Sequence, residues 1–489
     1  MSTDRRSGAH PVPDGRRARA RRRRRGLFLG TFGVVIAVLA AAGLVGAAAS
    51  GMQGPRVTSV EMDPAAATAA SGSRLIVTMN QSLEKVKTSQ VVVTPAAPFT
   101  VDTSGRGMGV RFTLPLHDDT EYTVRFTGIA GLGGGPAATV TERFRTPKLH
   151  VYLLERNAVG DTIVRTDLAD ADPVPVFRDD HIEDFRVTSS HLVVSVLDAD
   201  GRARLVVTDL DGSHRRDLPL PGDGTVSELQ SADRGELIGY TYSDANLGSG
   251  GTRESALYIA SLKDSAARAK PTPVAVTGRE KRVVDWHFVP DTDSILVLTY
   301  DGRLLLSGAT GANAADLGNG TAIDGIARGS SIAVIQRADG MFTVDLTNGT
   351  QAALVNATSA SGAAVPGFMG VVTPIPGTKA GSVRPYSIVT GPASGQGTTI
   401  FRVADDGRAT AVSTLPATSA ILQTCVSPSG RYAAVLEGPD IVSNPYDTYL
   451  LPMPEKVVTH VIELATGRQV HAFSGFDISW CQVPPPPSQ

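Results

Sequence analysis

Five acidic side chains recur at one position of a repeated segment in the later part of the sequence. Six segments align without gaps from an initial polar residue, which is acidic in five and glutamine in the sixth: Asp184, Glu228, Asp285, Asp324, Asp477 and Gln423. If these carboxylates line one opening of the fold, their charge attracts cations or amines, and they predict a mouth that binds a cation or polar ligand. The alternative is structural, with each acid accepting backbone amides within or between repeats.

Two cysteines, Cys425 and Cys481, each fall in one of the aligned segments. A disulfide between them would persist outside the cytoplasm. It would stabilise the fold by roughly 4 kcal/mol in the chain-entropy model. The alternative is a pair of buried free thiols. Both positions have the same parity, so ideal strands would point both side chains the same way, and a bulge or twist has to intervene.

The longest departures from the repeat are residues 243–254, 370–385 and 438–455. The last of these combines Tyr446, Asp447 and Tyr449. Aromatic residues exposed on a long loop suit a partner-binding surface, which is the function that we predict for these three residues. Packing of the loop onto the rest of the fold is the alternative.

Motifs for catalysis, metals or cofactors do not accompany these residues. The sequence has no His-x-x-x-His or Cys-x-x-Cys spacing, and no Gly-x-Ser-x-Gly elbow, phosphate-binding loop or dinucleotide fingerprint. We therefore assign no catalytic residue, metal or cofactor. His287, beside Trp286, is interpreted as a core or channel residue. Catalysis stays open, because a site can be assembled from separate loops.

The repeat itself predicts the fold. From residue 149 onward, strand pairs and Asp-Gly or Asn-Gly turns return every 40 to 55 residues or so, which is typical of a β-propeller with about four strands per blade. A seventh copy, near Met369–Pro374, fits poorly. The segment from Val426 to Val435, with its Ser-Pro-Ser-Gly turn, resembles TolB-like and WD-repeat-like propellers.

The two ends of the repeat region predict how the ring closes. Residues 149–178 supply three strands without an inner strand before them, whereas 476–482 reads as an inner strand followed only by the Pro-rich tail 483–489. We expect the C-terminal strand to complete the first blade of a seven-bladed propeller over 149–482. A closed ring removes exposed sheet edges.

Short strands of alternating polarity between residues 57 and 147 predict a β-sandwich. Leu75–Leu83, Leu114–Val124, the Gly-rich loop Gly128–Pro136 and Arg143–Pro147 resemble the bacterial Ig-like domain of S-layer and other surface proteins. The Asp and Asn usual in that family's loop are missing here. The resemblance implies a spacer or adhesion module, and Tyr122 is expected to be a core tyrosine that holds a loop.

The N-terminal region differs sharply from the rest. Residues 1–25 form an Arg-rich stretch that we expect to be disordered and cytoplasmic, and residues 26–49 carry no charge and are long enough for a transmembrane helix. A linker, 50–56, follows. Cleavage near Ala47–Ala49, or a twin-arginine signal at Arg24 and Arg25, is the alternative to a retained anchor.

The expected class is thus all-β, with a single membrane span, an Ig-like sandwich and a propeller. The overall net charge of −2 is small. We predict an extracytoplasmic binding or scaffold protein of the bacterial cell envelope, with an envelope protein or glycan rather than a nucleic acid as its partner. The sequence leaves the oligomeric state open. The alternative function is a propeller hydrolase or lyase that acts on envelope polysaccharide or peptide.

Overall fold

The computed structural model describes residues 30–43, 53–169, 172–232, 236–388 and 397–486, and apart from short helices it is all-β. The Arg-rich stretch 1–25 lies outside the described residues. Of the expected span 26–49 they include only 30–43, which is helical and exposed. Within the described ranges, no helix is both long and apolar enough to cross a membrane.

Residues 57–145 form two sheets that enclose one hydrophobic core. The first sheet contains, in spatial order, β1 (Val57–Glu61), β2 (Arg74–Met79), β5 (Gly107–Phe112) and β4 (Phe99–Ser104). The second contains β3 (Val91–Thr94), β6 (Glu121–Ile129) and β7 (Ala138–Arg145). Alternate residues of β2 and β6 point into this core, as the two-residue period of a strand requires. The Tyr122 hydroxyl, also in the core, accepts a hydrogen bond from the His117 amide. Helix α2 (Pro64–Ala69) is capped by Asp63.

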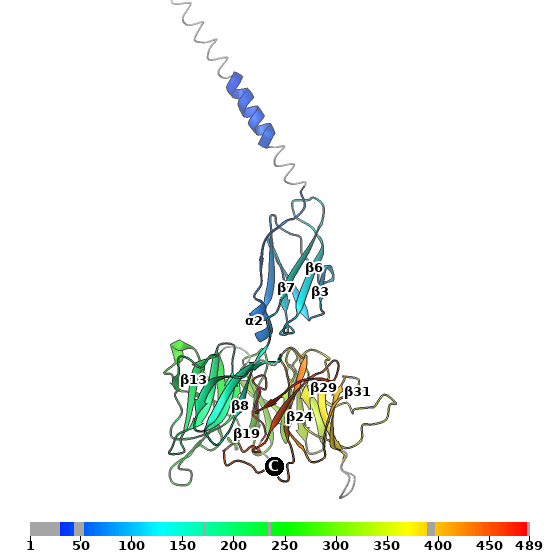
Figure 1. The fold of residues 1–489 in the computed structure, drawn as a ribbon. Coiled ribbons are helices and arrows are strands. Elements are labelled where there is room, and N and C mark those ends of the chain that lie inside the picture. Colours follow the sequence, from blue (N-terminus) through cyan, green and yellow to red (C-terminus); the bar gives the residue numbers. More distant parts are fainter. Residues whose placement is uncertain (1–29, 44–52, 170–171, 233–235, 389–396, 487–489) are drawn as a thin grey trace, which may run out of the picture.

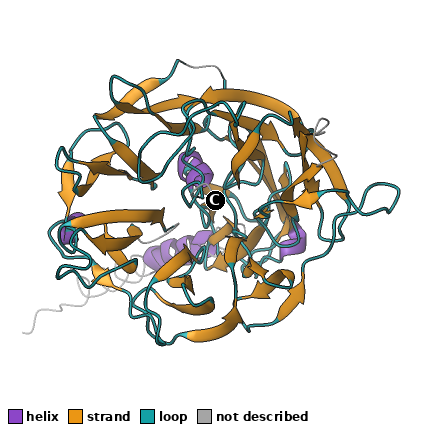
Figure 2. Cartoon of the chain, turned by 90° about the horizontal axis from the view of Figure 1, so that it is seen from below, coloured by secondary structure: helices purple, strands orange, loops and turns teal. Residues whose placement is uncertain are grey.

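Seven further sheets follow in chain order within the described residues, and Figure 2 shows them arranged around a centre. Blade 1 contains β8 (His150–Glu155), β9 (Asp161–Asp167) and β10 (Val174–Asp179), and blade 2 contains β11 (Ile182–Val187), β12 (His191–Leu197), β13 (Ala203–Asp209) and β14 (Arg216–Leu218). Blade 3 contains β15 (Gly224–Ser231), β16 (Leu237–Asp244), β17 (Ala256–Ser261) and β18 (Thr272–Pro273). Blade 4 contains β19 (Val283–Phe288), β20 (Ser294–Thr299), β21 (Arg303–Gly308) and β22 (Ala315–Asn319).

Blade 5 contains β23 (Ala322–Ile326), β24 (Ile332–Arg337), β25 (Gly340–Asp345) and β26 (Gln351–Ala353). Blade 6 contains β27 (Phe368–Met369), β28 (Thr373–Pro374), β29 (Ser382–Ile388), β30 (Gly397–Val403) and β31 (Ala409–Leu415). Blade 7 contains β32 (Ala420–Val426), β33 (Tyr432–Gly438), β34 (Val458–Glu463) and β35 (Arg468–Ser474). Two 3-10 turns, η1 (Thr88–Gln90) and η2 (Asp264–Ala266), complete the described elements. The prediction of an all-β chain with a propeller is confirmed.

The inner strands of blades 1 and 6 differ from the prediction. In blade 1, the segment 476–482 is not a strand: Phe476 forms a single antiparallel bridge with Leu154, and a turn follows. Asp477 has a φ of +56°, which breaks the extended conformation. In blade 6, the inner position is split between β27 and β28, both paired with β29.

The sandwich packs against one face of the propeller (Figure 1). Its contacts reach turns that join the innermost to the second strand of several blades. Arg431 Nη1 donates to the Asp118 carbonyl over 3.1 Å, and Ser71 donates to Asp291. Leu114 is buried so close to Gly329 that a Cβ there would lie 2.6 Å from it.

We call the opposite face of the propeller the distal face. Because neighbouring strands are antiparallel, the connections between second and third strands lie there, including the loop 438–457 of blade 7. Each inner strand begins at this face, so the register of acids lies in the distal half of the ring.

Candidate functional site

Two of the five predicted acids tie neighbouring blades together. Asp285 of blade 4 accepts the Ile323 amide of blade 5 at 2.9 Å, and Asp324 of blade 5 accepts the Val372 amide of blade 6 at 2.7 Å. Each carboxylate thus satisfies a backbone donor of the next blade. These contacts correspond to the structural alternative, although both side chains keep some exposure.

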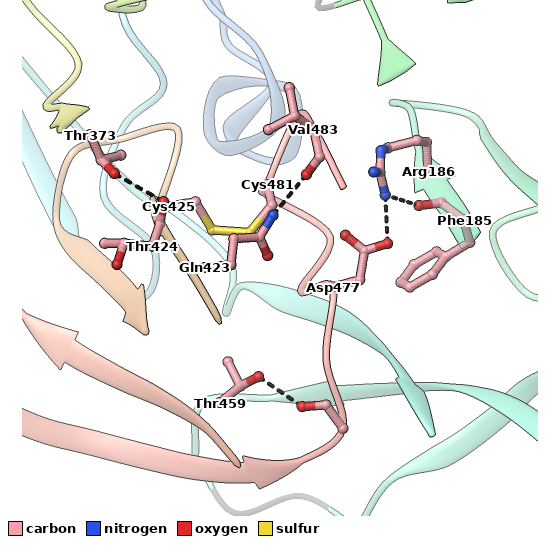
Figure 3. Close-up of a disulfide and its surroundings, with 11 residues drawn as sticks. Phe185, Arg186, Thr373, Gln423, Thr424, Cys425, Thr459, Asp477, Cys481 and Val483 are labelled. Atoms are coloured by element: carbon pink, nitrogen blue, oxygen red, sulfur yellow. Dashed lines mark hydrogen bonds and ion pairs between the residues drawn. A yellow bond between two sulfur atoms is a disulfide. The ribbon is translucent and has the colours of Figure 1, made fainter. Parts of the chain in front are cut away.

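Asp184 and Asp477 are buried around the guanidinium of Arg186. Figure 3 shows the contact between Arg186 and Asp477. Arg186 Nη1 lies 2.9 Å from Asp184 Oδ1 and 2.5 Å from Asp477 Oδ2. Burial raises the pKa of Asp184 well above its usual range; the Arg186 charge opposes this shift and the Asp477 charge adds to it. These two acids are therefore partners of a cation within the chain rather than free ligands. Sequence reasoning missed Arg186, although it lies two residues after Asp184, where period-2 alternation puts both on one side of a strand.

Glu228 is the acid with no hydrogen bond to its carboxylate among the described residues. It has a φ of +49° at an irregularity in β15, and its carbonyl accepts from Trp286 Nε1 at 3.2 Å. Burial and the nearby Asp285 charge raise its pKa to about 7, against the opposing charges of His287 and Arg186. Glu228 is thus partly protonated at neutral pH.

Asp324 and His287 complete this group around Asp285. Burial raises the pKa of Asp324 to about 6; the Val372 amide lowers it and the Asp285 charge raises it. His287 Nε2 lies 3.5 Å from Asp285 Oδ1. The structure therefore brings the predicted acids together in two groups, one neutralised by Arg186 and one rich in acids with raised pKa values. Across the described ranges, no three His, Cys, Asp or Glu side chains are placed to hold a metal ion.

The sixth position of the register belongs to blade 7. Gln423 donates to the Val483 carbonyl at 2.8 Å, and Pro484 and Pro485 are buried. The start of the Pro-rich tail is therefore packed against the fold.

The predicted partner loop folds back onto blades 1 and 2. Asp447 forms an ion pair of 2.7 Å with Arg156, and its other oxygen accepts the Met453 amide. The Tyr449 hydroxyl donates to Asp161 over 2.9 Å, and its ring lies 3.9 Å from that of His181. Burial and the Asp161 carboxylate raise the pKa of Tyr449. The Asp447 and Tyr449 side chains therefore hold the loop in place, which is the packing alternative.

The sequence did not reveal Arg156, the cation that holds the loop through Asp447 and Tyr449. Its side chain is 8% exposed, stacks 3.8 Å from the Tyr449 ring centre, and donates to the carbonyls of Glu183 and Leu451. What remains exposed on the loop is Val442, at 99%, with Tyr446 and Leu450. These apolar side chains form the accessible tip of the distal face.

Cys425 and Cys481 are joined in a disulfide, with Cα atoms 5.5 Å apart (Figure 3). The parity problem is solved by the turn after Phe476, since the Cys481 amide donates to the Ile478 carbonyl and the segment leaves the strand path. The bond links blade 7 to the segment that completes blade 1.

Comparisons with known proteins give a fold-level likeness. No family model and no curated protein matches the chain. A candidate 6-phosphogluconolactonase of Bacteroides fragilis is 10% identical, with a TM-score of 0.42 and coverage of 68% of this chain and 96% of that one. The propeller domain of Cps50 (Swd1) from Myceliophteria thermophila is 12% identical, with a TM-score of 0.39 and coverage of 61% and 87%. A candidate TolB of Agrobacterium tumefaciens is 13% identical, with a TM-score of 0.33 and coverage of 67% and 91%. At these scores the similarity carries no argument about function, and the propeller assignment depends on the strand topology above.

Proposed function

We propose that this chain is an extracytoplasmic binding or scaffold protein of the bacterial cell envelope. In this proposal, residues 26–49 anchor it in the membrane, the sandwich is an Ig-like spacer, and the propeller is presented to an envelope protein or glycan. The observation that carries the proposal is the one-sided docking of the sandwich, which leaves the distal face with its exposed tip accessible. The charge-free run 26–49 behind an Arg-rich stretch supports the anchor. The disulfide supports an oxidising compartment.

The binding role is tested by photo-crosslinking from the exposed tip. A crosslinking amino acid at Val442 in the full chain should capture a defined envelope component in intact cells, and Tyr446→Ala with Leu450→Ala should abolish that capture. Val92, exposed on the sandwich, is the matched control position. Capture that is equal from Val92, or that survives both alanine substitutions, contradicts the proposed role of the distal face.

The anchor and orientation are tested by protease accessibility. Protease added to intact cells should degrade the propeller and leave a tag at residue 1 intact. Degradation of the tag under the same conditions would refute the proposed orientation.

A second candidate, the hydrolase or lyase, is favoured by the two acids with raised pKa values. Glu228 at about 7 and Asp324 at about 6 lie near Asp285, and titrating carboxylates of this kind act as general acids and bases. The candidate requires turnover of purified envelope polysaccharide or peptide by the full chain and its loss in Glu228→Gln. The exposed Asp217→Asn is the control. Absence of turnover by the unmodified chain would eliminate this candidate.

A further inference from the structure

The boundary between blades 5 and 6 is packed unlike the others. Within the described residues, each of the other six boundaries contains a buried hydrophobic cluster that draws on both adjacent blades. The cluster beside blade 6 takes its residues from that blade and from the connection leading into it, and none from the strands of blade 5. Two clefts occupy this boundary instead.

The larger cleft has a volume of about 520 Å³, and its lining includes turn residues on the side of the sandwich, such as Ser330 and Gly377. Blade 5 contributes Ile332 and Val334 to its walls, and blade 6 contributes Ile375. The smaller cleft, of about 310 Å³, lies at the distal end of the same boundary and includes Asp324. The larger volume falls within the range of small-molecule sites, roughly 300 to 1,000 Å³.

Arg384 of β29 lines the larger cleft and is only 3% exposed. Its Nε–H donates to Ser382 Oγ at 2.8 Å, and Nη1 donates to the Val355 carbonyl at 2.6 Å. Among the described residues, no carboxylate lies within ion-pair distance of it. Burial lowers the pKa of Arg384, and the Tyr386 phenol and the Asp405 carboxylate oppose this shift. At hydrogen-bond distance the guanidinium is held by the two neutral oxygens above, and Nη2 keeps no partner there.

The other arginine that is buried to this degree among the described residues, Arg186, is shared by Asp184 and Asp477. A buried charge is costly unless it is paired, so an arginine held without a carboxylate beside an open cleft indicates an anion supplied from outside. The guanidinium edge matches a carboxylate, which accepts two parallel N–H bonds.

We propose that the larger cleft between blades 5 and 6 binds a small organic carboxylate with a short apolar body. The carboxylate pairs with the free edge of Arg384, and the apolar body lies between Val334 and Ile375. Asp405 also lines the cleft, but it is exposed at the rim and accepts the Gly381 amide. The site is separate from the distal face and does not depend on the function proposed above.

The test uses hexanoate as the probe, with hexylammonium and hexanol as matched probes of opposite and no charge. Calorimetric titration of the full chain should detect hexanoate alone binding at millimolar concentrations. Arg384→Met should weaken binding about tenfold or more, because a charged hydrogen-bond pair is lost. Arg402→Met, an exposed arginine on β30, should leave it unchanged.

A second variant keeps the result decisive if Arg384→Met fails to fold. Ala352 is exposed and lines the cleft, so Ala352→Trp should fill the cleft and abolish hexanoate binding while Arg384 stays in place. The proposal is overturned if hexanoate does not bind at about 10 mM, if hexanol or hexylammonium binds equally well, or if binding survives Arg384→Met or Ala352→Trp.

Discussion

Breaking the disulfide should open the ring at blade 1. The segment that completes this blade pairs with β8 through one bridge, Leu154 with Phe476, and through two hydrogen bonds between Tyr152 and Ser479. Regular inner strands elsewhere pair over several residues, as β11 does with β12. The covalent bond from Cys481 to Cys425 therefore contributes a large share of the free energy that keeps blade 1 complete.

The magnitude follows from the sequence separation of 56 residues between the two cysteines. In the chain-entropy model, opening a loop of this size lowers the free energy of unfolding by about 4 kcal/mol. For a domain of the propeller's size, with an unfolding entropy of about 0.7 kcal/mol/K, the loss corresponds to a fall in Tm of about 6 °C.

Thermal unfolding of the full chain with and without reductant measures this effect, and Cys425→Ala with Cys481→Ala reproduces it. Reductant should not change the Tm of the double variant, which controls for other actions of the reagent. Mass spectrometry under non-reducing conditions checks that the bond is present at the start. A Tm that changes by less than about 1 °C on reduction would refute the claim that the bond holds the ring closed.

Three further changes test other parts of the structure. Glu228→Gln should weaken the dependence of the free energy of unfolding on pH. The Glu228 carboxyl has a pKa of about 7 in the folded state and the usual 4.5 in the unfolded state, so between these pH values only the folded state retains its proton, and stability falls as pH rises. The free energies of unfolding from denaturant titrations at pH 5 and pH 7.5 should differ by about 2 kcal/mol less in the variant, and an unchanged difference contradicts the assignment. Arg156→Met leaves the partly buried Asp447 without its cation and should cost about 2 kcal/mol, with faster hydrogen exchange over 438–455. Arg204→Met, on an exposed pair, is the control. Leu114→Asp should undock the sandwich and expose residues 146–149 to protease, whereas cleavage at the rate of the unmodified chain would show that the docking does not depend on this side chain.

The architecture was predictable because each blade repeats the same physical pattern. Apolar second strands such as 295–300 and Asp-Gly turns recur at a fixed period, and local periodicity is what sequence reveals best. Residues 476–482 were wrongly predicted to form an inner strand, because their sequence pattern matches that of the other aligned segments. Asp477 adopts a left-handed conformation that ends the extended path, and it pairs with Arg186 of the neighbouring blade, a contact that local pattern does not reveal.

The candidate site was only partly predictable, because the sequence reveals a local register but not the contacts between blades. The register of acids could be read from alignment, but the partners that decide their charge lie on other blades, as Val372 does for Asp324. The partial burial of Tyr449 depends on contacts with Arg156, which lies far from it in the chain. Arg384 has no sequence signal at all, because what distinguishes it is the missing carboxylate on the facing blade.

The closure of blade 1 also sets an order of events during synthesis of the chain. The inner edge of β8 stays open until residues 476–481 arrive, after all other strands have been made. An open strand edge is a template for pairing with other chains. A chain under synthesis therefore carries an open strand edge until its last segment is made, and the Cys425–Cys481 bond then fixes that segment to blade 7.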